Sequence, residues 1–244
     1  MKMFLKENTN PNSTSLLNEV RGLAELRKFQ DVHKLRIPLV EEFTQQFIKM
    51  EKIDSTSPTK EGWIRLAQGL AALHGVHQEQ FGFEEDNYIG LNKQKNTPCD
   101  DWGEFYYECR LLFQVELISN QSVKDELAAI LKSKKSELIK KLNEHNPSAS
   151  LLHGDLWSGN VMFDESGPWL IDPAVYYGDR ETDLAMTEVF GGFPPIFYET
   201  YFSLYKKPEG YDYRNGLYKL YHILNHYNLF GDSYLGQLRA LLRF

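Results

Sequence analysis

Short extended patterns surround one helical pattern in the first fifty or so residues of the chain. Residues 3–6 are apolar enough for a strand, and the Asn- and Pro-containing turn that follows ends it. Apolar side chains then recur every three or four residues over 16–26, which predicts an amphipathic helix with its N-cap at 13–15. Two further strands are predicted over 36–43 and 47–53, so this part of the chain is expected to be rich in strands.

A polar run at residues 54–58 separates this region from the rest of the chain. It ends in Ser-Pro, a combination typical of a linker that leads into a helix with proline at its first position. We therefore predict two domains, one over residues 1–53 and one over 54–244.

The second domain is predicted to be mainly helical, with a few short strands between its helices. Helices are expected over 58–78, at two places within 101–144 and from 180 to the C-terminus, and an irregular stretch over 81–98. Short apolar strands are expected at 151–153, 161–163 and 169–171. The fold class predicted for the whole chain is therefore α+β.

Composition excludes several classes of function. The 244 residues carry 27 basic and 34 acidic side chains, a net charge of −7, and no basic run, which disfavours nucleic acid or an anionic membrane as partner. The apolar runs are too short to span a membrane and the N-terminus is too polar for a signal peptide, so we expect a cytoplasmic protein. Cys99 and Cys109 are the two cysteines, too few for a disulfide scaffold or a Cys-rich zinc site.

The densest group of chemically useful side chains lies in residues 153–160, His-Gly-Asp-Leu-Trp-Ser-Gly-Asn, and is followed by Asp172 at the end of a predicted strand. Phosphoryl transfer needs a carboxylate that accepts the proton of the attacking hydroxyl, and oxygen ligands that hold magnesium on the nucleotide phosphates. Asp155, Asn160 and Asp172 match these roles.

The spacing of these residues agrees with that of a kinase catalytic loop. Asp155 and Asn160 are separated as in H-R-D-x-x-x-x-N, with Gly154 in place of Arg, and Asp172 stands where D-F-G has its Asp. Taken singly, a Gly-Asp pair fits ordinary turn chemistry and Asn160 an ordinary cap. Their order along the chain favours the kinase interpretation, in which His153 is expected to brace the backbone.

A second pair of charged residues lies upstream of this loop. Lys6 ends the first predicted strand, and Glu19 lies on the apolar stripe of the first helix, where an unpaired carboxylate is costly. Pairing would satisfy Glu19 and direct the Lys6 ammonium at nucleotide phosphates. Two surface charges without mutual contact are the alternative, and these residues alone do not decide; together with the downstream loop they favour the pair.

Several runs of the sequence resemble the fructosamine kinase (ketosamine 3-kinase) family. The runs that carry the resemblance are 153–160, 171–181 and 183–186, then 81–83, 87–90, Trp102 with Phe105, 110–112 and 49–53. The resemblance implies a protein-kinase-like fold with an N-terminal nucleotide-binding lobe over 1–53 and a catalytic and substrate lobe over 54–244. It also implies ATP-dependent phosphorylation of the C3 hydroxyl of a ketoamine sugar, a step in the repair of glycation.

The resemblance assigns roles to individual residues. Asp155 would be the catalytic base, Asn160 and Asp172 would bind Mg²⁺, and Lys6 would touch the ATP phosphates with Glu19 behind it. Residues 49–53 resemble the family's nucleotide hinge, and the residues predicted to hold the adenine are Met50, Glu51 and Ile53. Asp183 resembles an aspartate that braces the catalytic loop, with an ordinary N-cap as the alternative.

Acidic and aromatic side chains would suit a ketoamine, because a ketoamine on lysine carries a cationic amine. The residues predicted to contact the substrate are Trp157, Asn87, Tyr88, Asp101 and Trp102. Trp157 is the strongest of these because it lies between the base and a metal ligand, whereas Asp101 precedes a predicted helix and could simply cap it. The ketoamine could be a small molecule or be bound to a protein.

The chain departs from the family pattern at its start. The family's first two strands and Gly-rich turn precede the strand lysine, and only five residues precede Lys6. An unpaired strand edge is therefore predicted. Either the chain is a shortened form, or a second copy covers this edge in a homodimer, or the protein is a kinase-like module without catalysis. An aminoglycoside or choline-type kinase is a further alternative to the ketoamine kinase.

Overall fold

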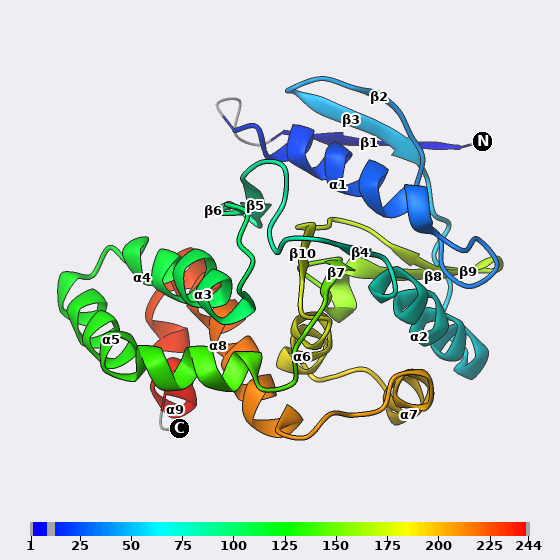
Figure 1. The fold of residues 1–244 in the computed structure, drawn as a ribbon. Coiled ribbons are helices and arrows are strands. Elements are labelled where there is room, and N and C mark those ends of the chain that lie inside the picture. The colour runs from blue at the N-terminus through cyan, green and yellow to red at the C-terminus, as the bar shows by residue number, and fades with distance from the viewer. Residues whose placement is uncertain (1, 9–12, 243–244) are drawn as a thin grey trace.

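The structure is a computed structural model that describes residues 2–8 and 13–242. Its first part is a small sheet covered by one helix, built from β1 (Met3–Glu7), α1 (Ser15–Phe29), β2 (Val40–Phe43) and β3 (Phe47–Glu51). The strands form an antiparallel sheet in the order β1-β3-β2. Figure 1 shows α1 between this sheet and the rest of the molecule. β1 lies at an edge of the sheet, as predicted, and whether a second copy covers that edge stays a prediction.

The register of the sheet sets the direction of Lys6. Lys6 lies opposite Ile48, whose side chain is buried against Leu16 and Val20 of α1. Because residues directly opposite each other in an antiparallel pair share one face, Lys6 also faces α1. The small core formed by Leu16, Val20, Ile48 and Met50 thus brings Lys6 of β1 close to the face of α1 that carries Glu19.

The second part of the chain is mainly helical. Its elements up to the predicted catalytic loop (residues 153–160) are α2 (Lys60–His74), β4 (His77–Gln78), β5 (Asn87–Ile89), β6 (Asn92–Gln94), α3 (Trp102–Tyr106), a π-helical segment (Tyr107–Leu112), α4 (Phe113–Glu116), α5 (Gln121–Asn143) and β7 (Ala149–Leu152). Those beyond it are β8 (Val161–Asp164), β9 (Gly167–Leu170), β10 (Tyr176–Gly178), α6 (Glu181–Val189), α7 (Pro195–Leu204), α8 (Tyr211–Phe230) and α9 (Leu235–Leu241). None of the described helices is long and apolar enough to cross a membrane.

The segment after α1 crosses from the small sheet to the large core. Arg36 forms a parallel bridge with Trp169 of β9, and Leu35 and Ile37 are fully buried in the large core. The predicted strand over 36–43 is therefore too long: its first residues pair with β9, and β2 begins at Val40. Hydrophobic contacts thus cross from the first predicted domain to the second, and the boundary after residue 53 stays a prediction.

Three local expectations are corrected by the structure. Pro58 does not start α2; Thr59 caps it, accepting a hydrogen bond of 3.0 Å from the Gly62 amide at its hydroxyl. The same helix ends at His74, because the chain turns at Gly75 and His77 pairs with β7. The stretch over 81–98, expected to be irregular, contains the β5–β6 hairpin.

Buried polar side chains hold the β5–β6 hairpin in place. Gln94 donates to the side chain of Asn87 (2.8 Å) and to the carbonyl of Ala174 (3.0 Å), and it accepts from the Tyr221 hydroxyl of α8 (2.6 Å). The hairpin is thereby fixed between α8 and the segment that follows Asp172.

Candidate active site

The catalytic loop between β7 and β8 is folded by contacts among its own residues. The Asn160 side-chain amide donates to the backbone carbonyl of Asp155 (2.8 Å) and to its carboxylate (3.2 Å). The predicted base and the predicted metal ligand are therefore adjacent. Burial raises the pKa of Asp155 to about 7 although Asn160 opposes the rise. A carboxylate with this pKa accepts a proton readily near neutral pH.

Asp183, at the start of α6, holds the backbone of this loop in place. Its two carboxylate oxygens accept from the backbone amides of His153 and Gly154, both at 2.8 Å, and one of them also lies 3.2 Å from His74 Nε2. Burial alone would raise the pKa of Asp183, but His74 and these amides hold it below its usual value. The alternative of a simple N-cap for α6 is wrong, because Asp183 bonds a different part of the chain.

His153 has the bracing position that its sequence context predicts. It is buried, which lowers its pKa, so the ring is neutral at pH 7. Its Nε2 lies 2.9 Å from the carbonyl of Ile171 and must donate there, which leaves Nδ1 to accept from the Asp155 amide at 3.3 Å. The ring thus fixes the separation between the loop of Asp155 and the segment of Asp172.

Lys6, Glu19 and Asp172 form an ion-pair triad. The Lys6 ammonium lies 2.8 Å from the Glu19 carboxylate and 2.7 Å from the Asp172 carboxylate. The Lys6 ammonium is thus shared by two carboxylates. Burial raises the pKa of Glu19, the more enclosed of the two, to about 7. Burial would also raise the pKa of Asp172, but Lys6 holds it below its usual value. The pKa of Lys6 is raised because both carboxylates together outweigh its burial. The contact of Lys6 with Glu19 excludes the alternative that these two residues are surface charges without mutual contact.

Asp172 has an unusual backbone conformation. Its φ is 52°, in the left-handed region that a non-glycine residue rarely adopts. Such strained residues are held in place by their surroundings and cluster at functional sites. In this conformation the Asp172 carboxylate lies 2.7 Å from the Lys6 ammonium.

These groups share one cavity of about 380 Å³ between α1, the catalytic loop and the β5–β6 hairpin. Its lining residues are Lys6, Glu7, Asn8, Ser15, Leu16, Asn18, Glu19, Asn87, Tyr88, Gly90, Leu91, Asp155, Trp157, Asn160, Asp172, Pro173 and Ala174. Four of them are carboxylates and one is a cation. The cavity therefore brings together the predicted base, the two predicted metal ligands and the lysine.

The predicted substrate residues divide into two groups. Trp157 and Tyr88 line the cavity, and the Trp157 side chain is partly open to solvent. Asn87 also lines it, but its amide donates to the Val175 carbonyl (2.7 Å) and its oxygen accepts from Gln94 and Asn96. Asn87 is thus occupied in holding the cavity wall.

Asp101 and Trp102 do not lie in the cavity, and their assignment as substrate residues is corrected. Trp102 is 1% exposed and donates from its indole to the Tyr218 hydroxyl at 3.0 Å, so it belongs to the core. Asp101 caps α3 by accepting from the Glu104 amide (2.8 Å) and also binds Asn143 (2.9 Å). The alternative of a helix cap is therefore the correct one for Asp101.

The predicted hinge residues lie outside this cavity as well. Met50 is buried against α1, and the Glu51 amide donates to the Leu39 carbonyl at 2.8 Å. Ile53 follows the end of β3. Contact of these three residues with adenine stays a prediction.

One set of contacts at the site was not found from the sequence: α1 is tied to the second part of the molecule. Glu85 accepts from Asn18 at 3.2 Å and forms an ion pair with Arg21. One turn further along α1, Glu25 accepts from the Tyr177 hydroxyl at 3.0 Å. These pairs are 64 or more residues apart in the chain, and nothing in the local pattern of either partner indicates them.

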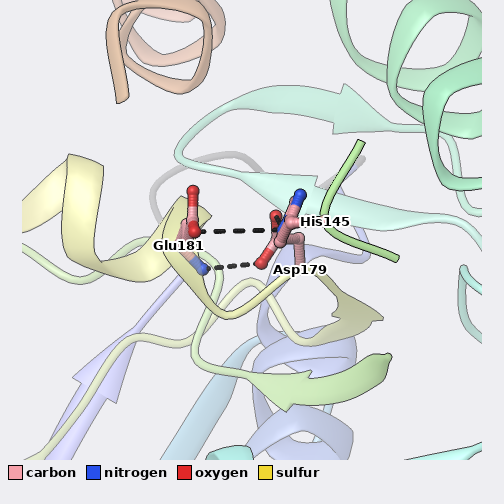
Figure 2. Close-up of side chains that lie close together, drawn as sticks. All are labelled: His145, Asp179 and Glu181. Atoms are coloured by element: carbon pink, nitrogen blue, oxygen red, sulfur yellow. Dashed lines mark hydrogen bonds and ion pairs between the residues drawn. The ribbon is translucent and has the colours of Figure 1, made fainter. Parts of the chain in front are cut away.

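A second cluster of ionisable groups is buried beneath the start of α6. Figure 2 shows His145 close to Asp179 and Glu181, with 2.8 Å between His145 Nε2 and Asp179 and 3.9 Å to Glu181. These atoms are close enough to hold a metal ion, but Arg214 already donates to both oxygens of Glu181 and Tyr218 donates to Asp179. A cation adjacent to the Arg214 guanidinium would be repelled, so we assign the cluster a structural role.

The fold is that of the protein-kinase-like class of phosphotransferases. The fold is shared with the gentamicin complex of APH(2″)-IIa, with a TM-score of 0.65 over 98% of this chain and 84% of that one at 15% identity. It is closer to a putative fructosamine-3-kinase from Thermobifida fusca, with a TM-score of 0.88, 30% identity and coverage of 99% of this chain and 84% of the other.

Sequence comparison then identifies the family. The profile of the fructosamine kinase family matches residues 1–243, and the chain belongs to that family. It is 42% identical over 199 residues to a probable ketoamine kinase of Synechocystis, covering 81% of this chain but 66% of that protein. It is 39% identical to a probable ketoamine kinase of Enterococcus faecium (98% and 86% covered) and 34% identical to a chloroplastic protein-ribulosamine 3-kinase of Arabidopsis thaliana (98% and 74%).

Proposed function

We propose that this protein transfers the γ-phosphoryl group of ATP to the C3 hydroxyl of a ketoamine sugar. The observation that carries the proposal is the convergence of Asp155, Asn160, Asp172 and Lys6 on one cavity. The names of the relatives, ketoamine kinase and ribulosamine 3-kinase, support the ketoamine over an aminoglycoside or choline. A kinase-like module without catalysis would have no need to keep four carboxylates and a lysine in one cavity.

In the proposed reaction, Asp155 orients the sugar hydroxyl and takes its proton. The hydroxyl oxygen then forms a bond to the γ-phosphorus while the bond between that phosphorus and the bridging oxygen breaks, and ADP leaves. Lys6 binds the phosphates, and Glu19 and Asp172 hold the ammonium in position for them. A pKa of about 7 lets Asp155 stay ionised at slightly alkaline pH and still accept a proton during transfer.

The residues present fit a magnesium ion. The nitrogen of the Asn160 amide is directed at Asp155, which leaves the amide oxygen as a ligand, and Asp172 supplies carboxylate oxygen. Oxygen ligands of this kind suit Mg²⁺, which when bound would neutralise charge on the transferred phosphate. Asn160 and Asp172 are therefore the residues that would hold it.

The charge of the cavity supports a cationic substrate. Glu7, Glu19, Asp155 and Asp172 face one cation, Lys6, in the lining. The amine nitrogen of a ketoamine is protonated near neutral pH, and its charge is attracted by this excess of carboxylates. The carboxylates would thus complement the cationic ketoamine, whereas Lys6 and a bound Mg²⁺ would complement the phosphates of ATP.

The test is magnesium-dependent ATP consumption with ribulose-lysine, fructose-lysine, kanamycin and choline as substrates. Turnover of the two ketoamines is expected, with its loss in Asp155→Ala and its retention in Glu165→Gln, an exposed acidic residue of the β8–β9 turn. Turnover of kanamycin or choline in place of the ketoamines would contradict the proposed substrate. Consumption that survives in Asp155→Ala would contradict the proposed base.

A further inference from the structure

A row of aromatic side chains leads from the catalytic cavity to the end of α8. Trp157, in the cavity wall, contacts Phe190 edge-on with ring centroids 5.8 Å apart, and Phe190 lies 4.7 Å from His226. His226 in turn packs on Phe230 and Tyr234, at 5.6 and 5.4 Å. We call Trp157, Phe190, His226, Phe230 and Tyr234 the aromatic ribbon. It connects the catalytic loop to the surface without a break.

The tip of the β5–β6 hairpin approaches the same end of α8 from another side. Asn92 donates to the Asn225 side chain at 2.8 Å, and a Cβ atom on Gly90 would lie 3.2 Å from Leu229. Leu91, at the tip, lines the cavity and is 69% exposed. Leu91 and the aromatic ribbon therefore both extend the wall of the cavity outward.

The outer end of this surface is apolar and open. Phe230 is 63% exposed and Trp157 36%. Burial lowers the pKa of His226, so this ring is uncharged at pH 7 and the aromatic ribbon carries no charge. Large apolar side chains that are exposed together and continuous with a catalytic cavity mark a binding surface.

The chemistry of the surface indicates which part of a substrate it receives. The phosphates and the sugar hydroxyl need the charged groups inside the cavity, whereas the ribbon offers apolar and aromatic faces. A ketoamine has one part of that character, the chain attached to its nitrogen. Aromatic faces bind alkyl chains and apolar peptide side chains, and they also attract the ammonium on that nitrogen.

We propose that the aromatic ribbon and Leu91 bind the group attached to the ketoamine nitrogen, so that the enzyme prefers glycated lysine within an apolar peptide to a ketoamine on a small amine. This inference rests on the proposed function and specifies its substrate class. It makes Phe230 and Leu91 specificity-determining residues that lie outside the catalytic loop.

The experiment compares kcat/KM for two ketoamines with the same sugar. One is ribulose attached to methylamine, and the other is ribulose attached to the lysine of a hexapeptide with leucine and phenylalanine neighbours. The wild type is expected to prefer the peptide. In Phe230→Ser and in Leu91→Ser the peptide-to-methylamine ratio is expected to fall about tenfold, the scale on which one apolar contact discriminates substrates. The matched control is Leu204→Ser, a 54% exposed leucine at the end of α7, which should keep the wild-type ratio.

The outcomes separate this inference from the proposed function. If Phe230→Ser and Leu91→Ser lower kcat/KM equally for both substrates, the two residues have a purely structural role. If the variants leave kcat/KM for both substrates at the wild-type values, the surface does not contact the peptide. Either result overturns this inference alone. Failure of the wild type to phosphorylate either ketoamine overturns the proposed function and this inference with it.

Discussion

The Lys6 ammonium lies 2.7 Å from the carboxylate of Asp172, a residue 166 positions further along the chain. This contact joins β1 of the small sheet to the segment that follows the catalytic loop. It depends on the sheet register that turns Lys6 toward α1 and on the left-handed conformation of Asp172. The lysine that would bind phosphates and the aspartate that would bind magnesium are therefore held as one unit.

Replacement of Asp172 tests that unit. Asp172→Ala removes a predicted magnesium ligand and one of the two partners of Lys6. We expect magnesium-dependent ATP binding to weaken at least about tenfold, because the phosphates lose an oriented cation. Calorimetric titration of ATP with and without Mg²⁺ measures the effect. An unchanged dependence on Mg²⁺ would remove Asp172 from the proposed metal site.

The pKa of Asp155 predicts a pH dependence of turnover. Burial raises this pKa to about 7, and the proposed base would act in its ionised form. As the pH falls below about 7, Asp155 takes up a proton and kcat is expected to fall, approaching tenfold per pH unit. A pH profile of kcat with saturating substrates measures this. A profile that is flat between pH 5.5 and 8 would contradict the role of Asp155 as base.

The same raised pKa predicts an effect on stability. Between its ordinary pKa and about 7, the folded protein keeps a proton on Asp155 that the unfolded chain has lost, so stability falls as the pH rises through this range. Asp155→Asn removes that cost and should stabilise the protein at pH 8 by on the order of 2 kcal/mol, less than the full shift implies because the site is partly open. Near pH 4 the two proteins should be similar. Urea unfolding at both pH values checks this, and a variant less stable than the wild type at pH 8 would contradict it.

Glu85 is predicted to position α1 for catalysis. It ties Asn18 and Arg21 of α1 to the second part of the molecule, and α1 carries Glu19. Glu85→Ala should let α1 move and raise the KM for ATP several-fold, with a smaller change in kcat. Glu84→Ala, at the neighbouring acidic position, is the matched control. Equal KM values for ATP in the wild type and Glu85→Ala would show that the tether does not set the position of Glu19.

The sequence predicted those parts of the site in which neighbouring residues act together. Asp155 and Asn160 lie in one loop, and their mutual hydrogen bond follows from their spacing. The pairing of Lys6 with Glu19 follows from the place of Glu19 on an apolar helix stripe, where a carboxylate needs a cation. In each case the local sequence pattern indicates why the contact forms.

Other features depend on contacts that no local pattern encodes. Trp102 resembles a substrate residue in the sequence, but its hydrogen bond to Tyr218 and its burial place it in the core. β10 was not predicted because it is three residues long and exists through its pairing with β7. The tether from Glu85 to α1 likewise joins segments that become neighbours once the chain has folded.

The central claim is that Asp155 directs phosphoryl transfer to a ketoamine sugar, and its most direct test is to follow the label from γ-³²P-ATP. The wild type, incubated with ribulose-lysine and Mg²⁺, should place the label on the C3 hydroxyl of the sugar, and Asp155→Ala should bind ATP but transfer none. Label found in inorganic phosphate alone, or on the sugar at the wild-type rate in Asp155→Ala, would contradict the account.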